Sequence, residues 1–296
     1  MSSLDFGIPV TQIIRERRSR RTYDDRPIDP QQLSSLEAYS EALQSLESPF
    51  GERARFGLID KMTSPDKPIR LGTYGLLKNP RYFLFGFIPE SKHDYTSFGY
   101  LFQHLILKAT ELGLSTCWFG YYHKNSFLEE ISPPPGEVVP AVCSVGHGAG
   151  RQSTFESIIR RKRKPLIRRP WGELFFVDTF AQALDSAGAM SEICGDDAAA
   201  YATAFEMIRL APSAGNHQPW RVIAKTSPFE ILFYLDRTDA SRGYEKRNLQ
   251  ALDIGIAMCH FDLAVRSAGI TGTWSTDDTG TPESPPRTEF VIRWRP

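Results

Sequence analysis

GYLFQHLILKATELGLSTCW, residues Gly99–Trp118, returns in altered form as GIAMCHFDLAVRSAGITGTW, residues Gly255–Trp274. The two copies align without a gap at a constant offset of 156 residues. They share a residue type at five positions: Gly99/Gly255, His104/His260, Leu107/Leu263, Gly113/Gly269 and Trp118/Trp274. Self-similarity of this kind indicates two related halves in one chain.

Each copy predicts a long buried helix followed by a short strand. Apolar residues cover most of the circumference of each helix, which is typical of a helix inside a domain or at a domain interface. Each helix is expected to end at its glycine, because glycine adopts the left-handed conformation that closes a helix at little cost. The runs that follow, STCWFGYY and TGTWST, have the composition of strands.

The flanking segments also correspond between the two halves. Aromatic and β-branched runs predict strands at residues 56–59, 79–88, 138–145, 221–224, 228–235 and 289–293. We therefore predict an α+β fold in which two antiparallel-rich sheets are flanked by helices and the long central helices pack together as an intrachain pseudo-dimer. The first repeat is placed at residues 1–170, a junction at 171–197, and a second, shorter repeat at 198–296.

Composition limits the class of protein. Lys plus Arg and Asp plus Glu number 35 each among 296 residues, so no bulk attraction to nucleic acid or to a membrane is expected. The four cysteines form no CxxC pair, and no zinc site, redox dithiol or other metal site is predicted. Few, widely spaced cysteines and an N-terminus without an apolar leader predict a cytoplasmic protein. No run approaches the ~18 apolar residues that a membrane helix needs.

The segment RRSRRTYDDRPI, residues 17–28, opens with a cluster of arginines. Converging guanidinium groups can hold a phosphate dianion through charge-assisted hydrogen bonds, and Ser19 adds a hydroxyl donor. The alternative is an exposed arginine face at a helix end, which is what basic runs usually form.

A second motif is the loop APSAGNHQPW, residues 211–220. Its small residues let backbone amides approach a flat ring closely. The side chains of Asn216 and Gln218 offer both donors and acceptors to the edge of a heterocycle. The alternative is a well-built turn in which Asn216 caps the loop and Trp220 fills the core, and for an arbitrary loop that alternative is favoured.

The third motif is GHGAGRQSTFESIIRRKRKP, residues 146–165, a glycine-rich turn followed by a basic cluster. It is neither a GxGxxG fingerprint opening a helix nor a Walker motif, so nucleotide-binding folds of those kinds are disfavoured. Lys162, Arg163 and Lys164 can supply further positive charge to a phosphate. Neither basic run has the interleaved aromatics that stack on bases, which disfavours nucleic-acid binding.

In this order the motifs resemble those of the nitroreductase family, particularly its branch with two half-domains fused in one chain. RRSRRTYDDRPI is similar to the family's N-terminal phosphate motif and APSAGNHQPW to its flavin-ring loop. DIGIAMCHFDLAVRSAGITGTW is similar to its central dimer helix, and GHGAGRQS with RRKRKPL to its C-terminal turn and basic tail.

The resemblance implies one FMN per chain. Members of the family normally place each flavin at a homodimer interface. Here the arginine motif occurs only in the first half and the intact ring loop only in the second. The matching position in the first half, LESPFGERARF at residues 46–56, is a degraded counterpart of that loop. The implied phosphate ligands are Arg17, Arg18, Ser19, Lys162, Arg163 and Lys164, with Arg21 as the charge near N1 and O2 of the ring. The implied ring contacts are Pro212, Ser213, Ala214, Asn216 and Gln218, the backbone at Trp118, Phe119 and Gly120, and an edge at Gly72, Thr73 and Tyr74.

The implied activity is that of a flavoprotein oxidoreductase. NAD(P)H would reduce the flavin, and an electron-poor small molecule such as a nitroaromatic or a quinone would be reduced in turn. No catalytic side chain and no obligate protein partner are expected. His104, His217 and His260 are expected to have structural roles. A flavin-binding protein without turnover stays open, with Tyr74, Trp118, Phe119, Tyr121 and Tyr122 as residues that would cover the ring. A nucleic-acid-binding protein would instead align the two basic runs in one stripe.

Overall fold

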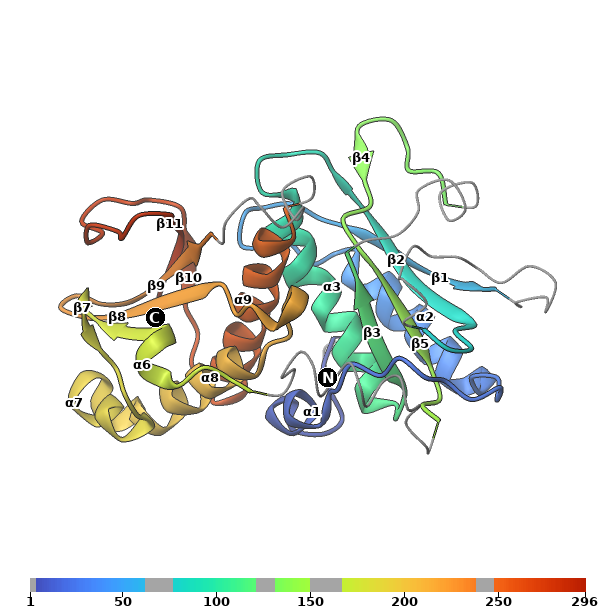
Figure 1. Cartoon of the computed structure of the whole chain (residues 1–296), viewed down its shortest axis with the longest axis horizontal. Coiled ribbons are helices and arrows are strands. Elements are labelled where there is room, and N and C mark those ends of the chain that lie inside the picture. The colour runs from blue at the N-terminus through green and yellow to red at the C-terminus, as the bar shows by residue number, and fades with distance from the viewer. Residues whose placement is uncertain (1–3, 62–76, 121–130, 150–166, 238–247) are drawn as a thin grey trace. The chain divides into compact units, whose positions relative to one another are not determined.

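The computed structural model describes residues 4–61, 77–120, 131–149, 167–237 and 248–296 (Figure 1). The chain divides into two compact units. Unit 1 consists of Met1–Ser48, Glu52–Asp94 and Leu101–Pro165. Unit 2 consists of Pro49–Gly51, Tyr95–Tyr100 and Leu166–Pro296.

Unit 1 contains an antiparallel sheet with helices against it (Figure 1). The strands follow the order β1-β2-β5-β3, with β4 beside β2. Their bounds are β1 (Arg55–Asp60), β2 (Tyr82–Pro89), β3 (Ser115–Phe119), β4 (Glu137–Val138) and β5 (Val142–Gly146). The helices are α1 (Val10–Glu16), α2 (Pro30–Leu43) and the greater part of α3 (Asp94–Glu111).

Local sequence explains where α2 begins and where it packs. The Asp29 carboxylate accepts a hydrogen bond from the Gln31 amide at 2.8 Å, and the Gln32 side chain accepts one from the Asp29 amide at 3.2 Å. These reciprocal bonds satisfy amides that a helix N-terminus leaves without partners. On its inner face, the Ser40 hydroxyl donates to the Phe56 carbonyl at 3.0 Å and joins α2 to β1.

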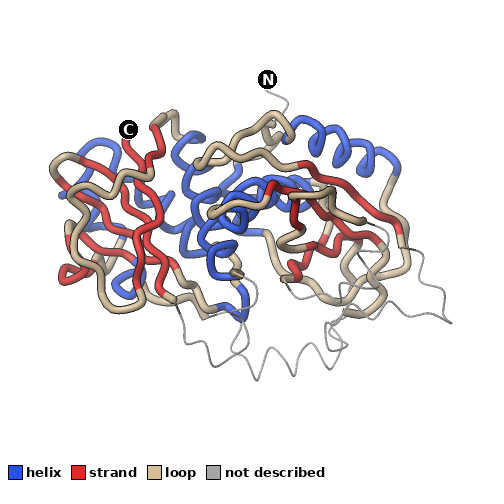
Figure 2. Tube along the Cα trace, turned by 90° about the horizontal axis from the view of Figure 1, so that it is seen from above, coloured by secondary structure: helices blue, strands red, loops and turns tan. Residues whose placement is uncertain are grey.

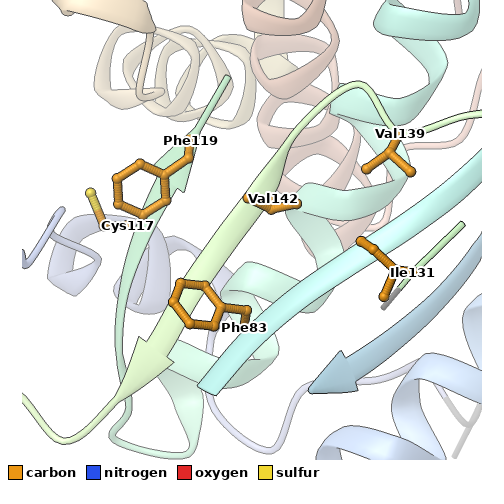
Figure 3. Packing of buried hydrophobic residues seen from close by; sticks show 6 residues of the cluster. All are labelled: Phe83, Cys117, Phe119, Ile131, Val139 and Val142. Atoms are coloured by element: carbon orange, nitrogen blue, oxygen red, sulfur yellow. The ribbon is translucent and has the colours of Figure 1, made fainter. Parts of the chain in front are cut away.

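One face of the unit 1 sheet carries a compact apolar cluster (Figure 3). Its members are Phe83, Cys117, Phe119, Ile131, Val139 and Val142. Cys117 and Phe119 fall at alternate positions of β3, as residues on one face of a strand must, and Phe83 of β2 is followed at alternate positions by Phe85 and Phe87, which pack against the cluster. The cluster therefore fixes which face of β3 is turned to the core.

Unit 2 contains a larger, mostly antiparallel sheet with helices beside it (Figure 2). The strand order is β10-β11-β9-β8-β6-β7, and β6 with β8 is the one parallel pair among the strands described. Their bounds are β6 (Phe175–Val177), β7 (Thr179–Ala183), β8 (Trp220–Thr226), β9 (Phe229–Asp236), β10 (Thr273–Ser275) and β11 (Thr288–Arg295). The α-helices are α6 (Trp171–Leu174), α7 (Ser191–Cys194), α8 (Ala198–Leu210) and α9 (Leu249–Ser267), with short 3₁₀ turns η1 (Ala187–Met190), η2 (Gly195–Asp197) and η3 (Ala214–Asn216).

Helix α9 is buried on nearly every side within unit 2. Phe261 lies edge-on to Trp294 at 5.2 Å between ring centroids and to Phe233 at 5.5 Å. Its neighbour His260 is fully buried and lies 2.9 Å through Nδ1 from the carbonyl of Met207 on α8. Residues 95–100 of α3 also belong to this unit and meet α9, where the Tyr100 hydroxyl donates to Asp262 at 2.7 Å.

The expected helices and strands are confirmed among the described residues, and the larger differences in strand bounds have local causes. The strand expected at residues 138–145 is divided into β4 and β5, because Pro140 lies between them and has no amide to donate to a ladder. The strand expected from residue 79 begins at Tyr82, since Asn79 has a φ of 52° and Pro80 follows it.

The segment at residues 171–197, for which we expected a junction, carries secondary structure of its own. It contains α6, and its strands β6 and β7 extend the sheet of unit 2. The short apolar run FFV that forms β6 was not predicted as a strand. Among the described residues, no helix combines the length and the apolar character that crossing a membrane requires.

Candidate functional site

The arginine segment of unit 1 follows the C-terminus of α1 and lies beside the edge strand β3. Ser19 forms a parallel bridge with Thr116, and the Arg20 amide donates to the Thr116 carbonyl at 2.9 Å. Two further bridges hold the segment, Thr22 with Lys78 and Tyr23 with Gly148. Its backbone is therefore fixed by strand-like pairing rather than by helix, although no periodic pattern in RRSRRTY announces a strand.

The arginines of this segment differ sharply in environment. The Arg17 side chain is only 5% exposed, and its charge opposes the effect of burial, which raises the pKa of the Cys143 thiol on β5. Arg18 is exposed, and its guanidinium donates to the carbonyls of Arg15 and Arg17 at the end of α1, where a cation is favoured. Ser19 and Arg21 are half-buried. Arg17 is thus the inward-facing member of the predicted phosphate group.

Strand β3 brings the predicted ring-contacting backbone next to the arginine segment within unit 1. Trp118 and Phe119 are its last residues, and Gly120 follows. The bridge from Ser19 to Thr116 places the arginine segment and the predicted ring-contacting backbone on neighbouring segments of the chain. Sequence spacing alone could not show this, since about one hundred residues separate them.

The side chains of Trp118 and Phe119 both pack against other residues of unit 1. Phe119 is 8% exposed and belongs to the apolar cluster on one face of the sheet (Figure 3). The Trp118 indole donates to Gln103 of α3 at 3.2 Å and lies edge-on to Phe102 at 4.9 Å between centroids. The hypothesis that these two side chains cover a flavin ring is weakened, because each already packs against its own unit.

The loop APSAGNHQPW of unit 2 has an unusual backbone. Three of its residues have positive φ: Gly215 at 59°, Asn216 at 59° and Gln218 at 51°. Glycine adopts this region freely and asparagine tolerates it, but for glutamine it is unfavourable. Left-handed residues outside glycine persist only where surrounding structure holds them, and they concentrate at functional sites.

Contacts within the loop and with helix α9, all inside unit 2, hold the backbone of this loop. The Ser213 hydroxyl accepts from the Gln218 amide at 2.9 Å, and the Ser213 carbonyl accepts from the Asn216 amide at 3.0 Å. The Asp253 carboxylate of α9 accepts from the Ala214 amide, at 3.0 Å and 3.1 Å to its two oxygens. Asp253 is 2% exposed, and burial raises its pKa well above the usual range while the Ala214 amide acts in the opposite direction.

A second set of contacts comes from residues 167–169, which follow the basic run in sequence. The Arg168 guanidinium donates to the carbonyls of Leu210 and Ala211 and to Asn216 Oδ1. The Arg169 amide donates to Gln218 Oε1 at 2.9 Å, and the amide groups of Asn216 and Gln218 both donate to the Ile167 carbonyl. In this structure both amide side chains therefore bind the chain itself, and flavin contacts for them stay predictions.

Sequence reasoning missed the roles of Asp253 and Arg168. Asp253 is an acid directly before the apolar run IGIAMC of α9, and such a residue requires a polar partner when buried. Arg168 stands among seven basic residues at positions 160–169, and nothing in the sequence of this run indicates that Arg168 bonds to the loop.

Two groups of predicted site residues lie outside the residues that the structure describes. They are Gly72, Thr73 and Tyr74 in one segment and Lys162, Arg163 and Lys164 in the other, together with Tyr121 and Tyr122 of the covering hypothesis. Of the histidines, His260 packs between α8 and α9, His104 is buried on α3 and His217 is half-buried in the loop.

Comparison with known proteins shows the family to which this chain belongs. Residues 9–265 match the family described as "Putative TM nitroreductase", so the chain belongs to that nitroreductase family. A solved structure from Thermotoga maritima, described as a putative nitroreductase, is 17% identical with a TM-score of 0.58, and the match covers 98% of this chain and 94% of that one. At this identity the likeness establishes the nitroreductase-like α+β fold.

Shorter nitroreductase structures match about half of the chain. One from Desulfovibrio desulfuricans, in complex with FMN, is 21% identical over 51% of this chain and 95% of its own, with a TM-score of 0.38. One from Clostridium difficile is 17% identical over 55% and 94%, with a TM-score of 0.42. No curated protein matches the sequence.

Proposed function

We propose that this chain binds one FMN and acts as an NAD(P)H-dependent oxidoreductase that reduces an electron-poor small molecule. Membership of the nitroreductase family supports an oxidoreductase. The observation that carries the proposal is the loop at residues 211–220, whose left-handed backbone is held in place by Ser213, Asp253 and Arg168.

The exposed surface of this loop suits a planar ring. Pro212, Ser213 and Ala214 are half-buried and Gly215 is exposed, so small side chains leave the backbone accessible. A flat heterocycle needs such a surface, because a large side chain would hold the backbone amides away from it. The site of a flavin ring is therefore proposed here, on unit 2.

The arginine segment of unit 1 suits a terminal phosphate. Arg17, Ser19 and Arg21 lie within five consecutive residues whose backbone is fixed beside β3. Guanidinium and hydroxyl donors held in this way satisfy the oxygens of a phosphate dianion, which needs several charge-assisted bonds. One phosphate, with no dinucleotide fingerprint in the sequence, favours FMN over FAD.

The residues of the chain would then bind and orient rather than react. FMN, when bound, supplies the hydride chemistry. Arg17 and Ser19 would hold the phosphate, and the positive charge of Arg21 would favour a negative charge on the pyrimidine edge of the ring. Pro212 to Ala214 would support the ring, and no side chain needs to donate a proton or act as a nucleophile.

The test is anaerobic reduction of the FMN-loaded protein. NADH and NADPH are added separately, and the absorbance of the flavin near its visible maximum is followed. Bleaching, followed by recovery when a nitroaromatic or quinone is added, supports the oxidoreductase. Protein that binds FMN but is bleached by neither nucleotide contradicts turnover and favours a flavin-binding protein.

A further inference from the structure

We propose that Arg168 is a positioning residue that holds the ring loop of unit 2 in its left-handed conformation. The inference rests on the proposed flavin function for its effect on FMN, but its first test does not require a flavin. Arg168 and the loop belong to the same unit, and the contacts between them lie inside that unit.

The guanidinium of Arg168 links the end of a helix to the loop. Its Nη2 donates to the Leu210 carbonyl at 2.9 Å. Its Nη1 donates to the Ala211 carbonyl at 2.8 Å and to Asn216 Oδ1 at 3.0 Å. The last carbonyls of a helix have no partner within it, and a cation at that end is also favoured by the helix dipole. Arg168 therefore closes α8 and fixes Asn216 with one planar group.

Arg168 bonds to Asn216, whose backbone has a left-handed conformation. Asn216 has a φ of 59°, and Gln218, two residues on, has a φ of 51°. The Asn216 side chain is bound at both ends, since its oxygen accepts from Arg168 and its nitrogen donates to the Ile167 carbonyl at 2.9 Å. Without the guanidinium, the amide loses one of its two anchors and the strained backbone loses part of its support.

The residues bonded to the ring loop follow the predicted phosphate charges in sequence. Lys162, Arg163 and Lys164 precede Arg168 by only a few positions. Among the described residues, Arg168 and the backbone of Ile167 and Arg169 bond to the loop. Arg168 is thus proposed to position the flavin site rather than to contact the flavin.

The chain offers a matched control at the next residue. Arg169 contributes its backbone amide to Gln218, but its side chain is partly exposed and, among the contacts of the described residues, forms a 3.7 Å ion pair with Glu173. Arg169→Ala therefore removes a guanidinium of the same segment and leaves the loop contacts in place. Arg168→Lys keeps the charge but cannot reproduce a planar fork with three acceptors.

The first measurement is amide hydrogen exchange of the flavin-free protein. We expect the amides of Asn216, His217 and Gln218 to exchange at least tenfold faster in Arg168→Ala, with a smaller increase in Arg168→Lys and none in Arg169→Ala. Equal exchange in wild type and Arg168→Ala would overturn the inference. If Arg168→Ala does not fold, the comparison of Arg168→Lys with Arg169→Ala decides in the same way.

The second measurement is FMN affinity with the visible circular dichroism of the bound flavin. We expect about tenfold weaker binding in Arg168→Ala, the size of losing a hydrogen bond to a charged group, together with a changed dichroism spectrum that Arg168→Lys partly restores. Faster loop exchange with unchanged affinity and spectrum would overturn the positioning role. Wild-type protein that binds no FMN would refute the proposed function and the flavin role with it, while the exchange result would still decide whether Arg168 holds the loop.

Discussion

Gly99 and Gly255 occupy equivalent places where α3 and α9 meet in unit 2. A Cβ atom at Gly99 would lie 2.2 Å from the Leu252 carbonyl oxygen, and one at Gly255 would lie 1.9 Å from the Thr96 carbonyl oxygen. Thr96 and Leu252 are separated by the same 156 residues as the two glycines. Each helix therefore meets the other in the same way, as two subunits do across a twofold interface, and this reciprocity supports the proposal of an intrachain pseudo-dimer.

The first prediction concerns these glycines. Alanine is the better helix former by about 1 kcal/mol, yet we expect Gly99→Ala and Gly255→Ala each to lower the free energy of unfolding by about 1–3 kcal/mol, because the methyl group forces two backbones apart. Denaturant unfolding measures this. Gly188→Ala is the control, since a Cβ there meets nothing closer than 3.8 Å and its φ is not positive; a change within about 0.5 kcal/mol is expected for it. Equal effects at all three positions would contradict a tight crossing.

The second prediction concerns the pH dependence of stability. Burial raises the pKa of Asp253 in the folded protein, whereas in the unfolded chain the pKa of an aspartate is about 3.9. Between these two values the folded state keeps a proton that the unfolded state has lost, so the contribution of this group to stability falls as pH rises. We expect Asp253→Asn, whose amide oxygen can still accept from Ala214, to show a flatter decline of unfolding free energy above about pH 4.

Asp253→Ala provides the comparison for that experiment. It removes the titration and also the acceptor of the Ala214 amide, so we expect the same flat profile with lower stability at every pH. Wild type and Asp253→Asn with the same slope from pH 4 to pH 8 would show that Asp253 does not titrate differently on folding.

The third prediction concerns the phosphate. Arg17→Ala removes a buried guanidinium from the proposed phosphate group, and we expect FMN binding to weaken by roughly 1.5–3 kcal/mol, about tenfold or more in affinity. Fluorescence titration measures the affinity. Arg26→Ala is the control, because Arg26 is in the same segment but is exposed and pairs only with Asp24 among the contacts described. If the two variants bind FMN equally well, the phosphate lies elsewhere.

The fold was largely predictable because its signals are local and repeated. The offset of 156 residues paired helices α3 and α9, and the correspondence between the halves placed a strand at RVIA, which lies in β8. Strand β6 was missed because three apolar residues carry no period, and its parallel pairing with β8 is a property of the folded sheet. Pro140 and Asn79 moved strand ends in ways that their own chemistry explains.

The sequence proposes the residues of the candidate site but not the contacts that hold them. The loop APSAGNHQPW and the arginine segment stay predicted site residues, and the structure adds the bridge from Ser19 to Thr116. The contacts of Arg168 and Asp253 with the loop span roughly forty residues each, and no sequence pattern encodes which arginine of a basic run will bond to a distant loop. Supports of this kind become visible only when distant segments are brought together.

Flavin content per chain tests the central claim most directly. The protein is saturated with flavin, freed of excess, denatured and analysed for the identity and amount of released flavin, with its mass in solution measured in parallel. We predict FMN, not FAD, at one molecule per chain, in a protein that retains this ratio as a monomer. Protein that retains no flavin after incubation with FMN would contradict the account, and two FMN per chain would contradict the single site formed by a fused pair.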